Sequence, residues 1–141
     1  MGVRREGREA AAQYLYLREV NGECDVESFY KFRGLSPAAR KFSGSLIGGT
    51  IQKQAEIDDI IRQNAQNYEL HRISAVDRNV LRVAIYEMRF CPDTPPVVAI
   101  NEAIEIAKKY STEESGRFVN GVLDQIRTTI KRPARTPAAS E

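Results

Sequence analysis

Apolar residues recur at helical spacing along most of the chain. The pattern is clearest between residues 97 and 126, where two apolar stripes with the period of an amphipathic helix follow one another. No segment alternates apolar and polar residues in the way that a half-buried strand does. The pattern therefore predicts an all-α fold of about six or seven helices.

Turn and cap signals divide this pattern into segments. The apolar stripe shifts phase between Ile51 and Ile57, which predicts a bend or break near Gln54 in the longest segment. Prolines at 92, 95 and 96 end one strongly apolar helix and set the turn into the next. The predicted helical segments cover residues 4–20, 26–32, 37–68 and 74–90, and then two more from 97 to about 130.

Two of these helices begin with the spacing of a capping box. In such a box a hydroxyl and a carboxylate three residues later each bond a backbone amide that the helix start leaves free. Ser74 and Asp77 have this spacing, and so do Ser111 and Glu114. Gly7 lies inside the first predicted helix, where glycine costs about 1 kcal/mol relative to alanine. We therefore expect the start of that helix to fray.

The chain of 141 residues is long enough for one domain with its own core. We predict one domain over residues 1–132 and a disordered tail over 133–141, which has no apolar stripe to bury. No apolar run approaches the roughly 20 residues that span a bilayer, and the N-terminus has no signal-peptide core. Cys24 and Cys91 lack ligand-type partners nearby in the sequence. We expect two free thiols and a cytoplasmic location.

Side chains that support catalysis are scarce. The only histidine, His71, has no second histidine or cysteine at ligand spacing. Phosphate-binding glycine fingerprints are absent, and Gly48 and Gly49 fall inside a helical pattern, where close packing of another helix explains them better. Glu113 and Glu114 stand at a helix start, where carboxylates complement the helix dipole. We predict no enzymatic activity, no metal site and no cofactor.

Basic residues gather at the two ends of the chain. The net charge of +2 divides into +1 for residues 1–9, −2 for the middle of the chain and +3 for residues 127–141. This distribution suggests a polyanionic partner such as nucleic acid, and solvated tails explain it equally well. Guanidinium groups bind phosphate bidentately, and arginine-rich segments commonly become ordered on RNA. The first helix is therefore a candidate RNA contact.

Three motifs together resemble the NusB family of bacterial transcription antitermination factors. They are RREGREAAAQYLY at the start, VDRNVLRVAIYE in the middle and VAINEAIEIAKKYSTEESGRFVNGVLD near the end, in the family's order and spacing. The resemblance covers residues 4–20 and 73–126, whereas residues 21–72 match only as a helical pattern. It implies two packed helical subdomains. It also implies a role in binding boxA RNA of ribosomal-RNA leaders together with the ribosomal protein NusE, within an RNA polymerase antitermination complex.

The resemblance also assigns roles to individual residues. The family's RNA-binding positions fall on Arg4, Arg5, Arg8, Gln13, Tyr16, Glu114, Ser115, Arg117, Phe118 and Asn120. Its NusE-binding positions fall on Asp77, Arg82, Tyr86 and Glu87. The family's basic run is often denser. Here Glu6 and Gly7 interrupt it, which lowers the strength of RNA binding that we expect without NusE. Glu114 is expected to weaken RNA binding, because its charge repels phosphate.

Two other functions remain compatible with the sequence. Some ribosomal-RNA cytosine methyltransferases carry a NusB-like helical domain, but no catalytic domain follows within these 141 residues, so we expect a stand-alone factor. A helical adaptor that binds only proteins is the other alternative, and binding of a boxA-like RNA separates it from the first function. Pairing of two copies through the RNA-binding surface, as in some family members, stays open.

Overall fold

The computed structural model describes residues 2–65 and 69–130. Within them the chain forms seven α-helices and one short 3-10 turn, without strands. The elements are α1 (Val3–Asn21), α2 (Val26–Arg33), α3 (Pro37–Gln52), α4 (Gln54–Asn64), η1 (Leu70–Arg72), α5 (Ala75–Phe90), α6 (Pro96–Tyr110) and α7 (Glu113–Arg127). The all-α prediction is confirmed, and the tail predicted at 133–141 lies outside the described residues.

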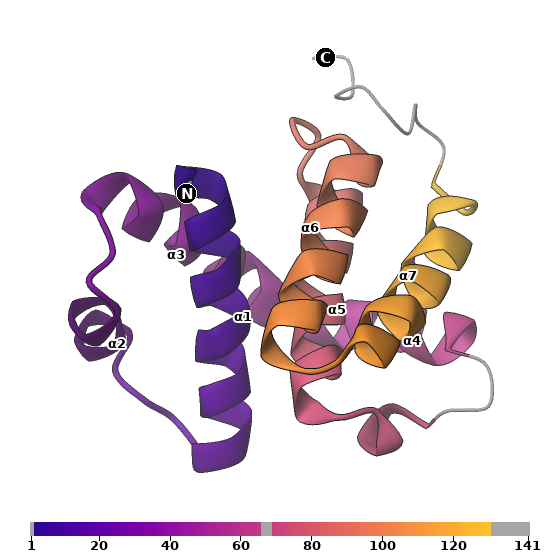
Figure 1. The fold of residues 1–141 in the computed structure, drawn as a ribbon, viewed down its shortest axis with the longest axis horizontal. Helices are drawn as coiled ribbons and strands as arrows, with labels where there is room; N and C mark the ends of the chain where they lie inside the picture. Colours follow the sequence, from indigo (N-terminus) through magenta and orange to yellow (C-terminus); the bar gives the residue numbers. More distant parts are fainter. Residues whose placement is uncertain (1, 66–68, 131–141) are drawn as a thin grey trace.

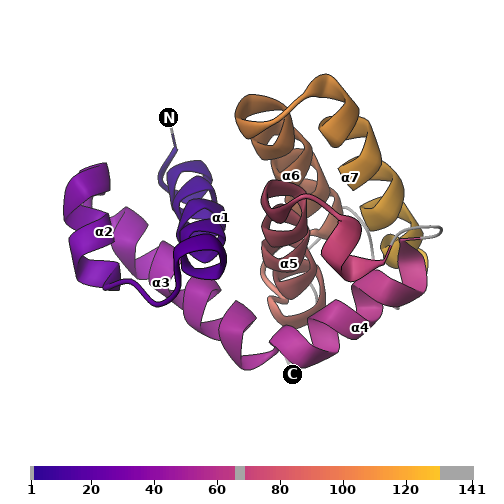
Figure 2. The ribbon, with the colours of Figure 1, turned by 90° about the horizontal axis from the view of Figure 1, so that it is seen from below.

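The helices form two subdomains that meet along α5. The first contains α1, α2 and α3, and the second contains α4 to α7 (Figure 1). In Figure 2 the two groups stand side by side, with α3 leading into α4 and α4 lying along the second group. Helix α5 contacts α1 and α3 of the first subdomain and α4, α6 and α7 of the second. This arrangement confirms the predicted pair of packed subdomains.

The core is centred on α5, whose apolar residues are buried on several sides. Leu81, Ile85 and Met88 have no exposed surface. Burying side chains of this size stabilises a fold by about 1.5–3 kcal/mol each. Ala11 of α1 and Leu123 of α7, also fully enclosed, belong to the same apolar cluster. The strongly apolar pattern of the helix that the prolines end is thus explained, because α5 has neighbours on several sides.

The long helical segment predicted from residue 37 is divided at Lys53, one residue before the expected break. Lys53 ends α3 and precedes α4 with φ −101° and ψ 10°, outside the helical region. The start of α3 follows its sequence signal, because the Ser36 hydroxyl accepts a hydrogen bond from the Ala39 amide at 3.2 Å and Pro37 occupies the first helical position.

One predicted capping box is confirmed in its cap residue and the other is wrong. Ser74 caps α5 by accepting a hydrogen bond from the Asp77 amide at 3.2 Å. Helix α7 is capped by Thr112 rather than Ser111, with the Ser115 amide donating to the Thr112 hydroxyl at 3.0 Å. The Ser111 hydroxyl instead lies 2.9 Å from the Ser115 hydroxyl. Ser111 and Thr112 offer the same chemistry, so sequence alone did not separate them.

Two glycines lie where helices approach closely. A Cβ added at Gly7 would lie 2.7 Å from the Phe42 ring, and one added at Gly49 would lie 2.0 Å from the Tyr86 ring. Gly7 therefore serves the packing of α1 on α3, and α1 is continuous from Val3. The close approach expected from the glycine pair is confirmed at Gly49 but not at Gly48, which has open space around it.

Within the described ranges, no helix combines the length and the apolar content that a membrane span requires.

Candidate nucleic-acid interface

Helices α1, α6 and α7 lie side by side and present one broad surface (Figure 1). Helix α1 begins at the upper end of this surface, whereas the corner between α6 and α7 lies at its lower end. Arg5 contacts Glu102 of α6 at the upper end. Further down, Lys109 near the end of α6 contacts Glu9. The start of α1, with Arg4 and Arg5, thus lies at the opposite end of this surface from the start of α7, where residues 114–120 are found.

The three arginines at the start of α1 have different surroundings. The Arg4 guanidinium is exposed and lies 5.0 Å from the centre of the Phe42 ring. Arg5 is half-exposed and bonds both carboxylate oxygens of Glu102, at 2.9 and 3.0 Å. Arg8 is only 5% exposed, and its guanidinium bonds both carboxylate oxygens of Glu87, at 2.7 and 2.9 Å. Arg4 and Arg5 can therefore meet a phosphate at the surface.

Arg8 is the member of the predicted RNA-binding set that the structure places in the interior. Its carboxylate partner Glu87 is 1% exposed and also accepts a hydrogen bond from the Thr94 hydroxyl at 3.1 Å. The pair joins α1 of the first subdomain to α5. A phosphate could reach Arg8 only by displacing Glu87 and leaving that carboxylate buried without a cation. Arg8 therefore holds the subdomains together in this arrangement.

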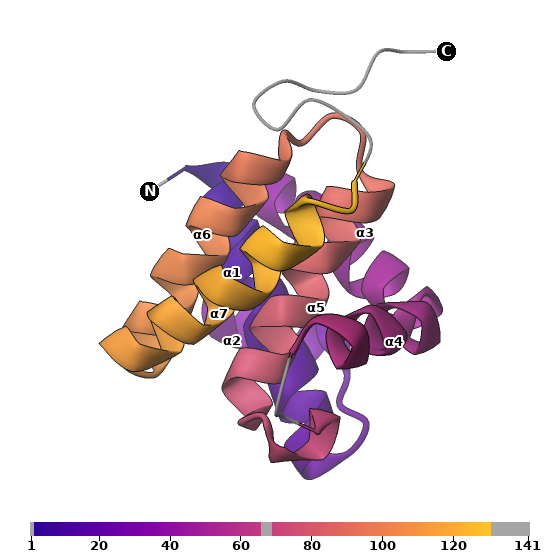
Figure 3. The same cartoon turned by 90° about the vertical axis from the view of Figure 1, so that its right-hand side faces the viewer.

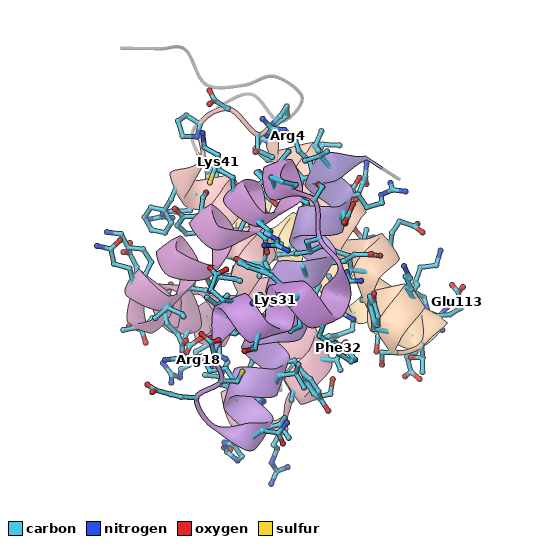
Figure 4. The ribbon with its side chains drawn as sticks, turned by 90° about the vertical axis from the view of Figure 1, so that its left-hand side faces the viewer. Arg4, Arg18, Lys31, Phe32, Lys41 and Glu113 are labelled. Carbon is cyan, nitrogen blue, oxygen red and sulfur yellow. The ribbon has the colours of Figure 1, made fainter. Side chains whose placement is uncertain are left out.

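Gln13 and Tyr16 line an apolar hollow of about 350 Å³ between α1, α2, α5 and α6. Its walls include Val76 and Tyr110, which were not among the predicted binding residues. Phe32 of α2 stands at its rim with 90% of its surface exposed, and Figure 4 shows this residue beside α2 on the outside of the molecule. The hollow lies beside the second half of α1 and the last turn of α6.

Ser115 and Phe118 line a second hollow, of about 210 Å³, where the starts of α5 and α7 meet. The remaining walls come from Arg72, Ile73, Ser74, Asp77, Thr112 and Glu114. Phe118 also borders a third hollow, of about 310 Å³, which Arg117 shares with residues at the end of α4. Asn120 is exposed on α7 but lines none of these hollows.

Asp77 has an unusual environment for a carboxylate. It is 7% exposed, and its Oδ1 atom has no hydrogen-bond partner among the described residues. Burial raises the pKa of Asp77 above its ordinary value, while the neighbouring Ser115 and Ser74 hydroxyls lower it by a smaller amount. Asp77 thus lies in the wall of the second hollow with unused capacity to accept a hydrogen bond.

The four residues predicted to bind NusE do not form one exposed surface. Arg82 is 6% exposed and bonds both carboxylate oxygens of Asp58, at 2.8 and 3.1 Å. The Glu87 carboxylate is paired with Arg8, and Tyr86 is half-buried against Gly49. The four side chains, Asp77 included, therefore point to separate places around α5. Their direct contact with a protein partner stays a prediction. The structure shows no common exposed face on which one partner could contact all four.

Several surface residues that border the hollows were missed from the sequence. Arg72 ends η1, Asn64 ends α4 and Gln125 lies near the end of α7. They are polar residues at unremarkable spacing, and only folding brings them beside Phe118. No sequence signal would have selected them. In the described part of the chain, no group of three His, Cys, Asp or Glu side chains is placed to hold a metal ion.

Comparison with known proteins agrees with the fold over most of the chain. The sequence model of the NusB family matches residues 5–128. A protein of Desulfotalea psychrophila is 43% identical over 141 residues, which cover 94% of this chain and 100% of the relative. That relative is named transcription antitermination protein NusB, which is not the name of an enzyme.

Two solved structures have the same arrangement of helices. NusB of T. maritima is 40% identical with a TM-score of 0.80, covering 93% of this chain and 92% of that one. A structure described as antitermination factors NusB and NusE in complex with dsRNA contains a chain that is 28% identical, with a TM-score of 0.84. The match covers 92% of this chain and 99% of that one.

Proposed function

The chain belongs to the NusB family, and we propose that it is a transcription antitermination factor that binds boxA RNA of ribosomal-RNA leader transcripts. In this proposal it binds the RNA together with NusE, and the pair joins the RNA polymerase antitermination complex. The solved structure of NusB and NusE in complex with dsRNA supports both kinds of partner.

The observation that carries the proposal is the composition of the surface on α1, α6 and α7. Exposed guanidinium groups lie toward both of its ends, at Arg4 and Arg5 on α1 and at Arg117 on α7. Tyr16 lines the hollow between α1 and α6, and Phe118 lines the hollows that α7 forms with α5 and α4; both rings are partly exposed. Proteins that bind single-stranded RNA place cationic side chains along the phosphate backbone and stack aromatic rings on the bases. Among the predicted residues we assign RNA contact to these five.

The buried residues act on this surface indirectly. We propose that Arg8, Arg82 and Glu87 fix the position of α5 against its neighbours, so that the surface is present before RNA arrives. Their ion pairs connect α5 to α1 and to α4. Preorganisation of this kind lowers the cost of ordering protein groups on binding.

A titration of boxA-containing RNA against a scrambled sequence, with and without NusE, tests the proposal. Fluorescence anisotropy at two salt concentrations gives the affinities. We expect tighter binding of boxA RNA, a further gain with NusE and weaker binding at higher salt, because counterions are released from the phosphates. Equal affinity for both sequences under all conditions would reject the function.

Glu102 competes with RNA for Arg5, so Glu102→Gln is expected to raise RNA affinity severalfold. The carboxylate holds the Arg5 guanidinium through two hydrogen bonds, and a phosphate must displace it. Glu105→Gln is the matched control, since it removes the same charge from α6. Glu105 forms a long ion pair with Lys108, at 3.7 Å, and does not hold Arg5 through hydrogen bonds. Anisotropy titrations that show equal effects for the two variants would mean that charge alone, rather than release of Arg5, sets the gain.

A further inference from the structure

The apolar hollow between α1, α2, α5 and α6 lies where the two subdomains meet. Figure 3, which looks onto α7 and α6, shows α1 and α2 behind them. The volume of the hollow, about 350 Å³, is at the lower end of the range of about 300–1,000 Å³ for small-molecule sites. Its lining is apolar or aromatic except for Gln13 and Arg33. We call it the subdomain hollow and define it by Gln13, Tyr16, Phe32, Arg33, Val76 and Tyr110.

The two polar residues of this lining have buried atoms without a partner. The Nε and Nη2 atoms of Arg33 and the Oε1 atom of Gln13 are buried, and none of them has a hydrogen-bond partner among the described residues. A buried polar atom without a partner costs free energy, and a ligand that supplies the partner removes that cost. The subdomain hollow therefore favours a ligand with both an acceptor for Arg33 and a donor for Gln13.

Three other arginines of the chain show which acceptor suits Arg33. Arg5, Arg8 and Arg82 each use the edge formed by Nε and Nη2 to bond both oxygens of a carboxylate. Arg33 takes part in no ion pair within the described ranges. A planar guanidinium and a carboxylate match in geometry and charge. The unpaired edge of Arg33 therefore suits a carboxylate that comes from outside the chain.

We propose that the subdomain hollow binds a small organic acid with an aromatic body and an N–H or O–H donor. The carboxylate pairs with the Nε and Nη2 edge of Arg33, and the donor bonds Oε1 of Gln13. The aromatic body packs against the apolar lining. Phe32 at the rim is 90% exposed, so a ligand that covers its ring removes apolar surface from water. This inference does not depend on the proposed RNA-binding function.

The lining favours a small acid over the phosphates of RNA. RNA phosphates stay hydrated and follow rows of exposed cations. The paired atoms that Arg33 offers are buried, and the lining holds no second cation among the described residues. One carboxylate carries one charge, which one guanidinium neutralises. A small acid can therefore leave water without bringing further charges into the hollow.

The test uses fluorescent acids and their neutral amides. The chain contains no tryptophan, so the emission of an indole ligand is observed without a tryptophan background. Indoleacetate, indolepropionate and indolebutyrate are the probes, because they join a ring N–H to a carboxylate through linkers of increasing length. The corresponding carboxamides keep the ring and lose the charge. We expect at least one acid to bind the native protein about tenfold more tightly than its amide, in the range of a charged hydrogen-bonded pair.

Variants of the two polar residues identify the contacts. Arg33→Gln should weaken binding of that acid about tenfold and leave the amide unaffected. Gln13→Leu should weaken the acid and the amide alike, since both carry the ring N–H. Neither side chain has a partner for the buried atoms named above, so these changes leave no partner group unpaired.

Lys31→Gln is the matched control, because it removes the same charge from α2 at an exposed position outside the lining. Figure 4 shows Lys31 and Phe32 on the outside of α2. This variant should bind the acid as the native protein does. The acid should also raise the unfolding temperature of the native protein and of Lys31→Gln, but not that of Arg33→Gln, since binding stabilises the folded state.

Three results would overturn the inference. Equal affinity of the native protein for acid and amide would show that Arg33 does not pair with the carboxylate. The absence of binding by all three acids at millimolar concentration would show that the hollow takes no ligand of this class. Loss of NusE binding in Arg33→Gln and Phe32→Ala, with no acid bound by the native protein, would make the hollow a protein site. The boxA titration tests the proposed function separately from all three.

Discussion

Replacing Glu87 by alanine is expected to lower the free energy of unfolding by about 3–5 kcal/mol, the range for breaking a buried ion pair on one side. The change leaves the Arg8 guanidinium 5% exposed with no carboxylate, and the Thr94 hydroxyl loses the acceptor at 3.1 Å. Because the Arg8–Glu87 pair joins α1 to α5, the loss should weaken the contact between the two subdomains. Urea denaturation followed by circular dichroism measures it.

Glu102→Ala is the matched control for that experiment. It breaks a bidentate pair of similar geometry with Arg5, but half of the Arg5 side chain is exposed to water. Exposed pairs contribute about 0–1 kcal/mol, so this variant should stay within about 1 kcal/mol of the native protein. Equal destabilisation by Glu87→Ala and Glu102→Ala would show that burial of the Arg8–Glu87 pair does not set its contribution.

Gly49→Ala and Gly48→Ala are expected to change stability in opposite directions. A methyl group at position 49 would lie 2.0 Å from the Tyr86 ring, so α3 and α5 must separate or Tyr86 must move. Overpacking of this kind costs about 1–3 kcal/mol. At position 48 nothing lies within 4 Å, and alanine in a helix interior should stabilise by about 0.5–1 kcal/mol relative to glycine.

Thermal and urea unfolding of the two glycine variants, which differ by one position in α3, provide the comparison. The neighbouring control removes any general effect of alanine on helix propensity. Stabilisation by both substitutions would mean that Tyr86 adapts without cost and that the close approach of α3 to α5 carries no packing requirement.

Much of the fold could be predicted from the sequence because each helix has a local signal. Apolar periodicity identified α1 to α7, and the phase shift near Gln54 located the division between α3 and α4 within one residue. The N-cap of a helix could not be predicted where two neighbouring residues of similar chemistry can both serve as the cap. Ser111 and Thr112 both precede α7, and the turn out of α6 decides that Thr112 is the cap.

The surroundings of the candidate site could not be predicted, because they depend on contacts between distant segments. Arg8 and Glu87 are 79 positions apart, and nothing local to either shows that they form a buried pair. Arg8 consequently looked like a surface arginine beside Arg4 and Arg5. Arg82, with its partner Asp58 on α4, was likewise assigned to a partner surface. Resemblance predicted the region, and burial limits which of its residues are exposed to a partner.

The salt dependence of RNA affinity for single arginine variants tests the central claim most directly. Arg4→Ala, Arg5→Ala and Arg117→Ala are compared with Arg127→Ala, which removes a charge paired with Asp124 on the far part of α7. Each of the first three should lower the slope of log affinity against log salt by about one, and Arg127→Ala should leave it unchanged. A slope that none of the first three variants alters would contradict RNA binding on the surface of α1, α6 and α7.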